Sequence, residues 1–262
     1  MKNFLTNKTA QMWLWLIFLL LAWELASRLG WVHTHILPPF SRVAANTFNE
    51  LFAGRLGVQV LNSMSIILVG FFLSFTLATV ITALSMWLQP IDSLFNTLST
   101  IMNPVPTIAL MPLIIMWFGI DTGAMLVLMA HSILWALIRN LLDGLRSVPP
   151  MYREWGKNIG LSPWQMFTDI VVPAIMPHFL AGVRIGWGRA WRSLISAEMI
   201  FGMIGGFGGL GFFIYTARAF ANFTRVMSGV VVIIIIGILF ETLLFGQIEK
   251  HTIRKWGMAT HE

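Results

Sequence analysis

Charged side chains are scarce in this sequence, and four of them lie inside one strongly apolar stretch. Lys, Arg, Asp and Glu make up 11% of the 262 residues, yet residues 176–200 contain Arg184, Arg189, Arg192 and Glu198. If that stretch is a helix in lipid, a charge near its centre costs about 2.5–3.5 kcal/mol even on a lenient insertion scale. Such charges either form internal pairs or mark a route for an oppositely charged solute.

Spacing places the candidates on a helix. Arg189, Arg192 and Ser196 recur at i, i+3 and i+7, so they share one helical face. Glu198 lies six positions beyond Arg192, which is the wrong side for a direct pair. One hypothesis is a solute pathway lined by Arg189, Arg192, Ser196, Glu198 and the apolar-segment histidine His131. The alternative is structural: pairing with Glu198, Glu241 or backbone carbonyls, contact between subunits, and an ordinary helix contact for His131.

Composition identifies the solvent of these helices as lipid. The chain is 57% hydrophobic, with a mean hydropathy of +0.77, whereas a soluble domain has about 25% charged residues. It contains no cysteine, which excludes disulfides, thiolate chemistry and cysteine-ligated metals. The net charge of +6 comes from cations at the ends of apolar segments or inside one of them, so it indicates membrane orientation and lipid headgroups, not nucleic acid.

The apolar segments predict an all-α protein with six transmembrane helices. The predicted spans cover approximately residues 12–29, 60–88, 93–118, 122–144, 176–200 and 226–248. Pro104, Pro106 and Pro112 bend or break the third span, which must therefore pack inside a bundle. Between the first two spans, residues 37–56 predict a short amphipathic helix at the membrane surface, capped by Ser41.

Six spans put both termini on one side of the membrane. The basic tail, the N-terminal lysines, Arg146, Arg153 and Lys157 fall on that side, so both termini are predicted to be cytoplasmic, although four other arginines fall outside.

The polar interval 147–173 predicts two capped helical pieces. Pro149 and Pro150 can begin a helix that ends near Ile159, with Gly160 in the left-handed position. Ser162 and Gln165 then form a capping box. The two pieces would form a compact cytoplasmic knob whose aromatic residues offer contact area to a partner. The alternative is a plain loop between two spans.

Two glycine patterns do not predict nucleotide binding. The pair Gly156-Lys157 lacks the first glycine and the Ser or Thr of a phosphate-binding loop. Gly206, Gly208 and Gly211 match a dinucleotide fingerprint, but membrane spans flank them and no acidic residue follows at the required distance. We expect instead an outer gate or docking loop containing Gly205, Gly206, Gly208, Gly209 and Gly211. An intramembrane hydrolase is not supported, because its catalytic motifs are absent and the aspartates lie near span ends.

Residues of the polar interval resemble the E-A-A, G, I, L-P signature of ATP-binding-cassette (ABC) importer permeases. Six positions separate Glu154 from Gly160, ten separate Gly160 from Ile170, and three separate Ile170 from Pro173. Trp and Gly replace the two alanines, and Val172 replaces leucine. A longer ordered series resembles the nitrate/sulfonate/taurine/bicarbonate subgroup: Ile36-Leu37-Pro38, Pro104-Val105-Pro106, Pro112-Leu113, Trp117-Phe118-Gly119, Asp143 to Pro150, Ala190-Trp191, Ala197-Glu198 and Gly209-Leu210-Gly211.

This resemblance implies a single permease domain, residues 1–262, with a type I ABC importer bundle in the bacterial inner membrane. Two copies, as a homodimer, would form the pathway. Two separate ABC ATPase subunits would bind ATP and Mg²⁺, and a periplasmic binding protein would deliver the solute. The chain itself would carry no cofactor, metal or catalytic residue. The ATPase-coupling residues would be Tyr152, Arg153, Glu154, Trp155, Gly156, Gly160, Trp164, Ile170 and Pro173.

The subgroup further implies a small anionic organic or inorganic solute. A neutral or cationic vitamin-like solute, such as a thiamine precursor, is the alternative. An ion channel or an intramembrane enzyme is the alternative of another class.

Overall fold

The computed structural model describes residues 8–203 and 208–251, and all regular structure in this part of the chain is helical. The elements are α2 (Lys8–Arg28), α3 (Phe40–Phe52), α4 (Leu56–Trp87), α5 (Gln89–Met102), η1 (Thr107–Leu110), α6 (Met111–Phe118), α7 (Thr122–Ser147), α8 (Pro150–Asn158), α9 (Pro163–Gln165), η2 (Met166–Val171), α10 (Val172–Phe201), α11 (Leu210–Ala219), α12 (Phe223–Leu239), η3 (Phe240–Phe245) and α13 (Gly246–His251). The turns η2 and η3 are π-helical.

Five helical segments in the described ranges are long and apolar enough to cross a membrane. They are Ala10–Arg28, Leu56–Trp87, Thr122–Ser147, Pro163–Phe201 and Phe223–Ile248. They correspond to the first, second, fourth, fifth and sixth predicted spans. A sixth span exists only if one bent helix pair is counted as one. The all-α membrane architecture is therefore confirmed.

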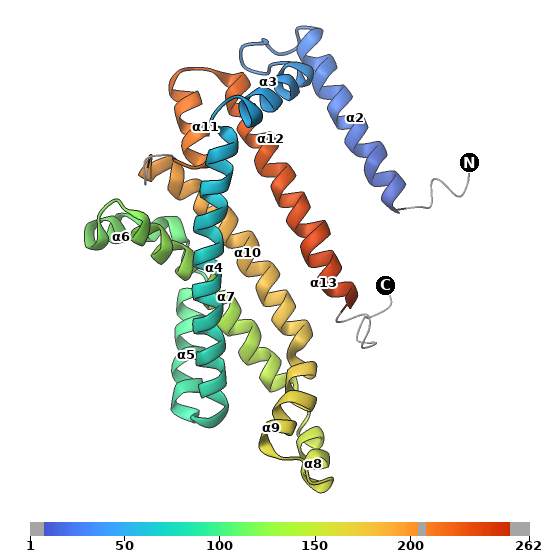
Figure 1. Ribbon diagram of the computed structural model, residues 1–262, viewed down its shortest axis with the longest axis vertical. Helices are drawn as coiled ribbons and strands as arrows, with labels where there is room; N and C mark the ends of the chain where they lie inside the picture. The colour runs from blue at the N-terminus through green and yellow to red at the C-terminus, as the bar shows by residue number, and fades with distance from the viewer. Residues whose placement is uncertain (1–7, 204–207, 252–262) are drawn as a thin grey trace.

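The bent pair occupies the predicted third span, 93–118, which is not one continuous helix. Helix α5 and the segment Thr107–Phe118 meet at 94°. Pro104 and Pro106 lie at the break, where each removes a backbone donor. Figure 1 shows α5 beside the second half of α4 and α6 pointing sideways from near the middle of the molecule. The prolines thus lie at a sharp turn of the chain.

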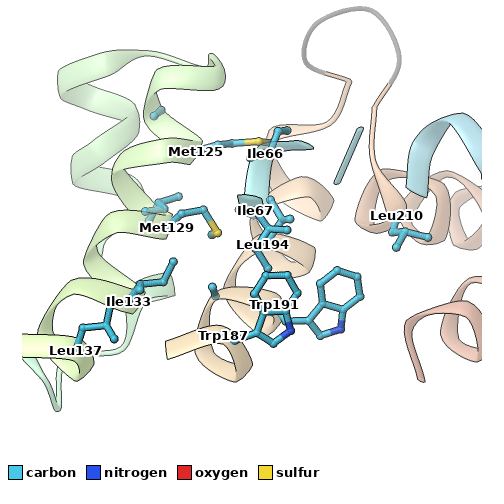
Figure 2. Packing of buried hydrophobic residues seen from close by; sticks show 14 of the residues in the cluster. Ile66, Ile67, Met125, Met129, Ile133, Leu137, Trp187, Trp191, Leu194 and Leu210 are labelled. Carbon is cyan, nitrogen blue, oxygen red and sulfur yellow. The ribbon is translucent and has the colours of Figure 1, made fainter. Parts of the chain in front are cut away.

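Helix α7 forms the centre of the core. Its residues Met125, Met129, Ile133 and Leu137 recur every four positions and are buried against α4 and α10 (Figure 2). The facing side chains are Ile66 and Ile67 of α4 and Trp187, Trp191 and Leu194 of α10. An apolar stripe at this spacing lies on one side of a helix, so α7 is held between its two neighbours.

Two glycines permit this close packing. A Cβ on Gly70 of α4 would lie 2.7 Å from the Cβ of Met129, and one on Gly182 of α10 would lie 2.9 Å from the Cβ of Asn140. Small residues at helix contacts let membrane helices approach closely, which increases van der Waals packing.

Helix α3 confirms the predicted helix between the first two spans but begins differently. Pro39 is its N-cap residue, and Ser41 lies inside the helix. Ser41 does not cap; its N–H and hydroxyl both donate to the carboxylate of Glu24 on α2, at 3.0 and 2.9 Å. Arg225 of α12 forms an ion pair with Glu50 of α3, so α3 connects α2 to α12.

Candidate solute-binding cavity and coupling knob

A cavity of about 210 Å³ lies at the break between α5 and η1. Three parts of the chain meet there: the end of α5 with the turn that follows it, the middle of α7, and α10. The lining residues are Met102, Asn103, Pro104, Val105, Pro106, Thr107, His131, Ser132, Trp135, Arg189, Arg192 and Ser193. Three predicted pathway residues, Arg189, Arg192 and His131, are therefore brought together.

The two arginines give the cavity its charge. Nη1 of Arg189 donates to Oδ1 of Asn103 at 2.5 Å, and the side chain of Arg192 is exposed. Within the described ranges neither guanidinium forms an ion pair with a carboxylate. The predicted alternative of pairing with Glu198 or Glu241 therefore does not occur in these residues. The cavity presents two positive charges beside neutral polar groups.

A chain of hydroxyl groups also lines the cavity. Ser132 of α7 donates to Ser193 of α10 at 2.8 Å, and the hydroxyls of Thr107 and Ser132 lie 2.7 Å apart. His131 Nδ1 is 3.5 Å from the Thr107 hydroxyl. These contacts join η1, α7 and α10 around the cavity. The cavity consequently offers hydrogen-bond donors of two kinds, guanidinium and hydroxyl.

Ser196 and Glu198 lie apart from this cavity, although they were predicted to line the same pathway. Ser196 is half-buried and absent from the lining. Glu198 is 1% exposed. Its carboxylate accepts hydrogen bonds from the Ser63 hydroxyl at 2.6 Å and from the N–H of Gly211 at 2.8 Å. Glu198 thus joins the end of α10 to α4 and to the first turn of α11.

The glycine-rich segment lies at the end of α10 farther from α8 and α9 (Figure 1). Gly205 and Gly206 fall outside the described residues. Gly208 has a φ of +68°, and a Cβ on Gly209 would lie 2.1 Å from Oε1 of Glu198. A Cβ on Gly211 would lie 2.2 Å from the carbonyl oxygen of Ile195. Close packing on Glu198 and on the α10 backbone therefore accounts for two of these glycines.

The predicted two-piece knob is present at the other end of α10. Helix α8 ends at Asn158, and Gly160 adopts a φ of +76°. The N–H of Gly160 donates to the carbonyl of Lys157, and that of Leu161 to the carbonyl of Gly156, at 3.0 and 2.9 Å. This is the Schellman pattern of helix ends. Ser162 and Gln165 then form the predicted capping box, so both expected local signals are confirmed.

The knob is held together around Gly156. A Cβ at this position would lie 2.5 Å from Cε of Met166 and 3.0 Å from Cδ1 of Ile170. Helix α8 therefore packs directly on η2. Ile170 and Pro173 line a groove of about 370 Å³ together with residues of α8.

The surface of the knob carries unburied aromatic rings. Tyr152, Trp155 and Trp164 are 40%, 56% and 71% exposed, and Glu154 is exposed beside them. Arg153 belongs to α8, but its side chain lies outside what the structure describes. Large exposed aromatic side chains are favoured at protein interfaces, so the knob has the chemistry of a docking surface.

The resemblance to ABC importer permeases implied that Pro173 would break the chain before the fifth span, but the proline does not do so. The chain stays helical from Pro163 to Phe201, and Pro173 lies in the first turn of α10. The preceding turn, Met166–Val171, is π-helical. A wider turn re-arranges the i to i−4 pairing, and this accommodates the proline without ending the helix.

Sequence reasoning missed several cavity residues, namely Asn103, Thr107, Ser132, Trp135 and Ser193. Two signals in the sequence pointed to three of them. Asn103 and Thr107 flank the two prolines at the break, and Ser193 directly follows Arg192. The sequence of α10 alone does not show which of its residues face α7. The helical face that begins at Arg189 includes both Ser193 and Ser196, and only the packed structure separates them.

Comparison with known proteins assigns the family. The family model described as binding-protein-dependent transport system inner membrane component matches residues 70–251. The putative aliphatic sulfonates transport permease protein SsuC of Escherichia coli (strain K12) is 29% identical over 95% of this chain and 92% of its own length. The taurine transport system permease protein TauC of the same strain is 31% identical over 60% of this chain and 56% of its own length.

A third relative comes from Synechocystis sp.. The nitrate import permease protein NrtB of Synechocystis sp. is 26% identical over 72% of this chain and 67% of its own length. With these matches, the apolar helices make the chain a multi-pass inner-membrane protein. It belongs to the family of inner-membrane components of binding-protein-dependent transport systems, as the transmembrane permease subunit of an ABC importer rather than an enzyme.

Proposed function

We propose that this permease imports a small anion that carries an oxoanion head group, and that the head group binds in the cavity at the α5–η1 break. The observation that carries the proposal is the pair Arg189 and Arg192, which face this cavity without a carboxylate partner in the described ranges. Inside a membrane an uncompensated cation is costly, and an anionic ligand offsets that cost. The named relatives transport sulfonates, taurine and nitrate, each of which has an oxoanion group.

Within one copy of the chain, the cavity is smaller than a typical ligand site. Its volume of about 210 Å³ is below the range of roughly 300–1,000 Å³ common for drug-sized ligands. It suits an inorganic anion or a short organic sulfonate. A neutral or cationic vitamin-like solute would leave both guanidiniums without a counter-charge, so that alternative is not favoured.

We further propose that the knob, 147–173, couples the permease to a separate ABC ATPase that binds ATP and Mg²⁺. Two ATPase subunits would serve two copies of this chain in a homodimer. Support comes from the exposed rings of Tyr152, Trp155 and Trp164 beside Glu154. The glycine segment at the opposite end of α10 would face a periplasmic binding protein, with both termini on the cytoplasmic side.

Initial uptake rates test the solute. The importer, assembled with its ATPase and binding protein, is reconstituted in proteoliposomes and offered radiolabelled taurine, ethanesulfonate, nitrate and a cationic thiamine precursor. For an accepted anion, Arg192→Gln is expected to lower uptake by about tenfold or more, because one unit charge near the ligand is lost. Arg192→Lys should retain part of the rate.

Arg184→Gln is the matched control. Arg184 lies on the same helix but pairs with Glu241 and does not line the cavity, so its loss should leave the KM for the anion unchanged. Wild-type uptake by Arg192→Gln, or accumulation of the thiamine precursor alone, would contradict the proposal.

Co-purification tests the coupling role. Glu154→Ala is expected to reduce recovery of the ATPase with the tagged permease, or to uncouple ATP hydrolysis from uptake. If association and transport-coupled hydrolysis both persist at wild-type levels, Glu154 has no role in coupling.

A further inference from the structure

Helix α5 carries a row of polar side chains below the cavity. Asp92, Asn96, Thr100 and Asn103 are spaced by four, four and three residues, so they lie on one helical face. Each of them contacts an arginine of another helix. The row begins near the start of α5 and ends at the cavity, where Asn103 accepts the hydrogen bond from Arg189.

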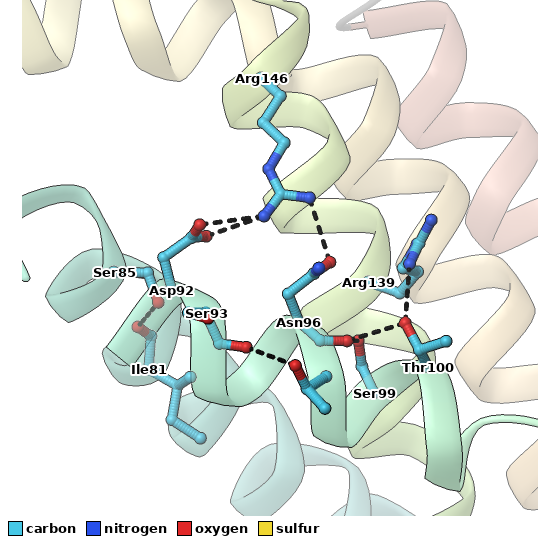
Figure 3. A network of polar contacts seen from close by, with 10 residues as sticks. Ile81, Ser85, Asp92, Ser93, Asn96, Ser99, Thr100, Arg139 and Arg146 are labelled. Atoms are coloured by element: carbon cyan, nitrogen blue, oxygen red, sulfur yellow. Dashed lines mark hydrogen bonds and ion pairs between the residues drawn. The ribbon is translucent and has the colours of Figure 1, made fainter. Parts of the chain in front are cut away.

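Two arginines of α7 contact the residues of this row that precede Asn103 (Figure 3). Arg146 donates through Nη2 to both carboxylate oxygens of Asp92, at 3.1 and 3.0 Å, and through Nη1 to Asn96 at 3.1 Å. Arg139 donates through Nη1 to the hydroxyl of Thr100 at 3.2 Å. With Arg189, three guanidiniums follow the polar face of α5 from its first turns to the cavity.

The same face of α7 leads to the cavity. Ser132, Arg139 and Arg146 are seven residues apart, which repeats the same orientation on a helix. Ser132 lines the cavity. At the other end, a second hollow of about 330 Å³ is lined by Asp92, Arg146 and Pro150, the first residue of α8. The polar faces of α5 and α7 therefore connect the cavity to the base of the knob.

Several of these side chains are partly exposed, and Thr100 lies well along α5. Arg139 and Asp143 are 42% and 43% exposed, and Arg146 and Asp92 are 45% and 34% exposed. Thr100 lies eleven residues beyond Gln89, the start of α5, which is about 16 Å along a helix. Ionised groups at membrane depth face water or protein, because facing hydrocarbon is costly. The polar row must consequently line an aqueous space or meet another chain.

Arg139 retains donors for a passing ligand. Its Nε donates to Asp143 at 3.0 Å and its Nη1 to Thr100, while a guanidinium has five N–H groups in all. The Arg139–Asp143 pair joins residues i and i+4 and is partly exposed; such pairs are weak. An oxoanion can therefore share this guanidinium without displacing a strong interaction.

We infer that the polar face of α5, with Arg139 and Arg146 of α7, lines the exit route from the cavity toward the knob, and that Arg139 makes this route selective for anions. The inference rests on the proposed function for the identity of the solute, but the aqueous route can be tested without transport. A second copy of this chain would supply the remaining wall.

Thiol accessibility provides the test, because the chain has no cysteine of its own. Thr100→Cys is introduced into the permease, and the importer assembled with its ATPase is placed in lipid nanodiscs. The rates of modification by anionic sulfonatoethyl methanethiosulfonate and by its cationic trimethylammonium analogue are measured on the permease band and divided by the rates for free 2-mercaptoethanol. Leu73→Cys, on an exposed apolar part of α4, is the control.

The expected result is that the thiol at position 100 reacts with both reagents, that the normalised anion-to-cation ratio exceeds one, and that the control thiol does not react. Adding Arg139→Gln should lower the ratio by about tenfold, since the reagents differ by two unit charges. Arg139→Lys should preserve the ratio, which separates charge from a change in folding.

Two results would overturn the inference. A thiol at position 100 that is inert to both reagents, with and without ATP and vanadate, would show that the row is sealed by protein. An unchanged ratio in Arg139→Gln would show that Arg139 does not select anions. Neither result would contradict the proposed function. That proposal is tested separately, by whether loss of Arg192 leaves anion uptake intact.

Discussion

The guanidinium of Arg189 donates to the side chain of Asn103, which is the C-cap residue of α5. The two residues are 86 positions apart in the chain. The end of a helix carries partial negative charge on its last carbonyl groups, so a cation placed there is stabilised without a carboxylate. This contact explains how α10 can carry a positive charge into the membrane and still leave it available to a ligand.

A carboxylate at position 103 should pair with Arg189 and make its guanidinium less available to an anionic ligand. Asn103→Asp places a negative charge in contact with Arg189 and is expected to lower anion uptake by about tenfold or more. Asn103→Leu removes the hydrogen bond without adding charge and should have a smaller effect. Both are measured as initial uptake rates in proteoliposomes, with size-exclusion chromatography confirming assembly. Equal effects of the two substitutions would mean that the contact is purely structural.

The sequence was sufficient to place Arg189 and Arg192 on one helical face, because helical periodicity is a local property. It was not sufficient to exclude Glu198 from the cavity. Glu198 is on the same helix, but its carboxylate is held away from the cavity by hydrogen bonds from Ser63 and Gly211. Contacts between such distant residues follow from helix packing, which a single helix pattern does not contain.

Glu198 is predicted to stabilise the fold rather than to bind solute. Glu198→Ala leaves the Ser63 hydroxyl and the Gly211 N–H without their acceptor in a buried site, which should cost about 2–4 kcal/mol. Glu198→Gln keeps one acceptor oxygen and should cost roughly half as much. The measurement is thermal unfolding of the detergent-solubilised complex. If Glu198→Ala keeps its unfolding temperature but loses uptake, Glu198 belongs to the pathway after all.

The two glycines of the knob should respond differently to alanine. Gly160 has open space around a Cβ but a φ of +76°, so Gly160→Ala is expected to cost about 1–2 kcal/mol in backbone strain. At Gly156 the nearest obstructing atoms belong to the flexible end of Met166, so Gly156→Ala should be tolerated and Gly156→Leu should not. ATPase activity stimulated by the binding protein is the readout. Normal stimulation in Gly160→Ala would remove the need for a left-handed residue.

The knob was largely predictable because its signals are local: two prolines, a glycine and a capping box within one short interval. The effect of its final proline on the helix, and the shape of the third span, were less predictable. Pro173 follows a π-helical turn, and the helix continues through it into α10. The prolines at 104 and 106, in contrast, lie at a 94° bend. The difference depends on whether neighbouring backbone can re-pair, which is a property of the packed bundle.

The hydroxyl chain at the cavity has a direction. A hydroxyl has one proton, and Ser132 donates its proton to Ser193. The hydroxyl of Thr107 lies 2.7 Å from that of Ser132. Ser193, which accepts from Ser132, lines the cavity next to Arg192 in the chain and has a hydroxyl proton of its own that can be donated to a ligand.

Ser193 is therefore expected to donate a hydrogen bond to the solute head group. Ser193→Ala should raise the KM for anion uptake by about tenfold, since hydrogen bonds to charged groups contribute about 1.5–3 kcal/mol. It should leave complex assembly and basal ATP hydrolysis unchanged. Ser196→Ala is the matched control, because Ser196 lies three residues further along α10 and outside the cavity, and its KM should equal that of the wild type. The two KM values are compared in one proteoliposome series; a rise for Ser196→Ala alone would place the head group on the neighbouring turn of α10.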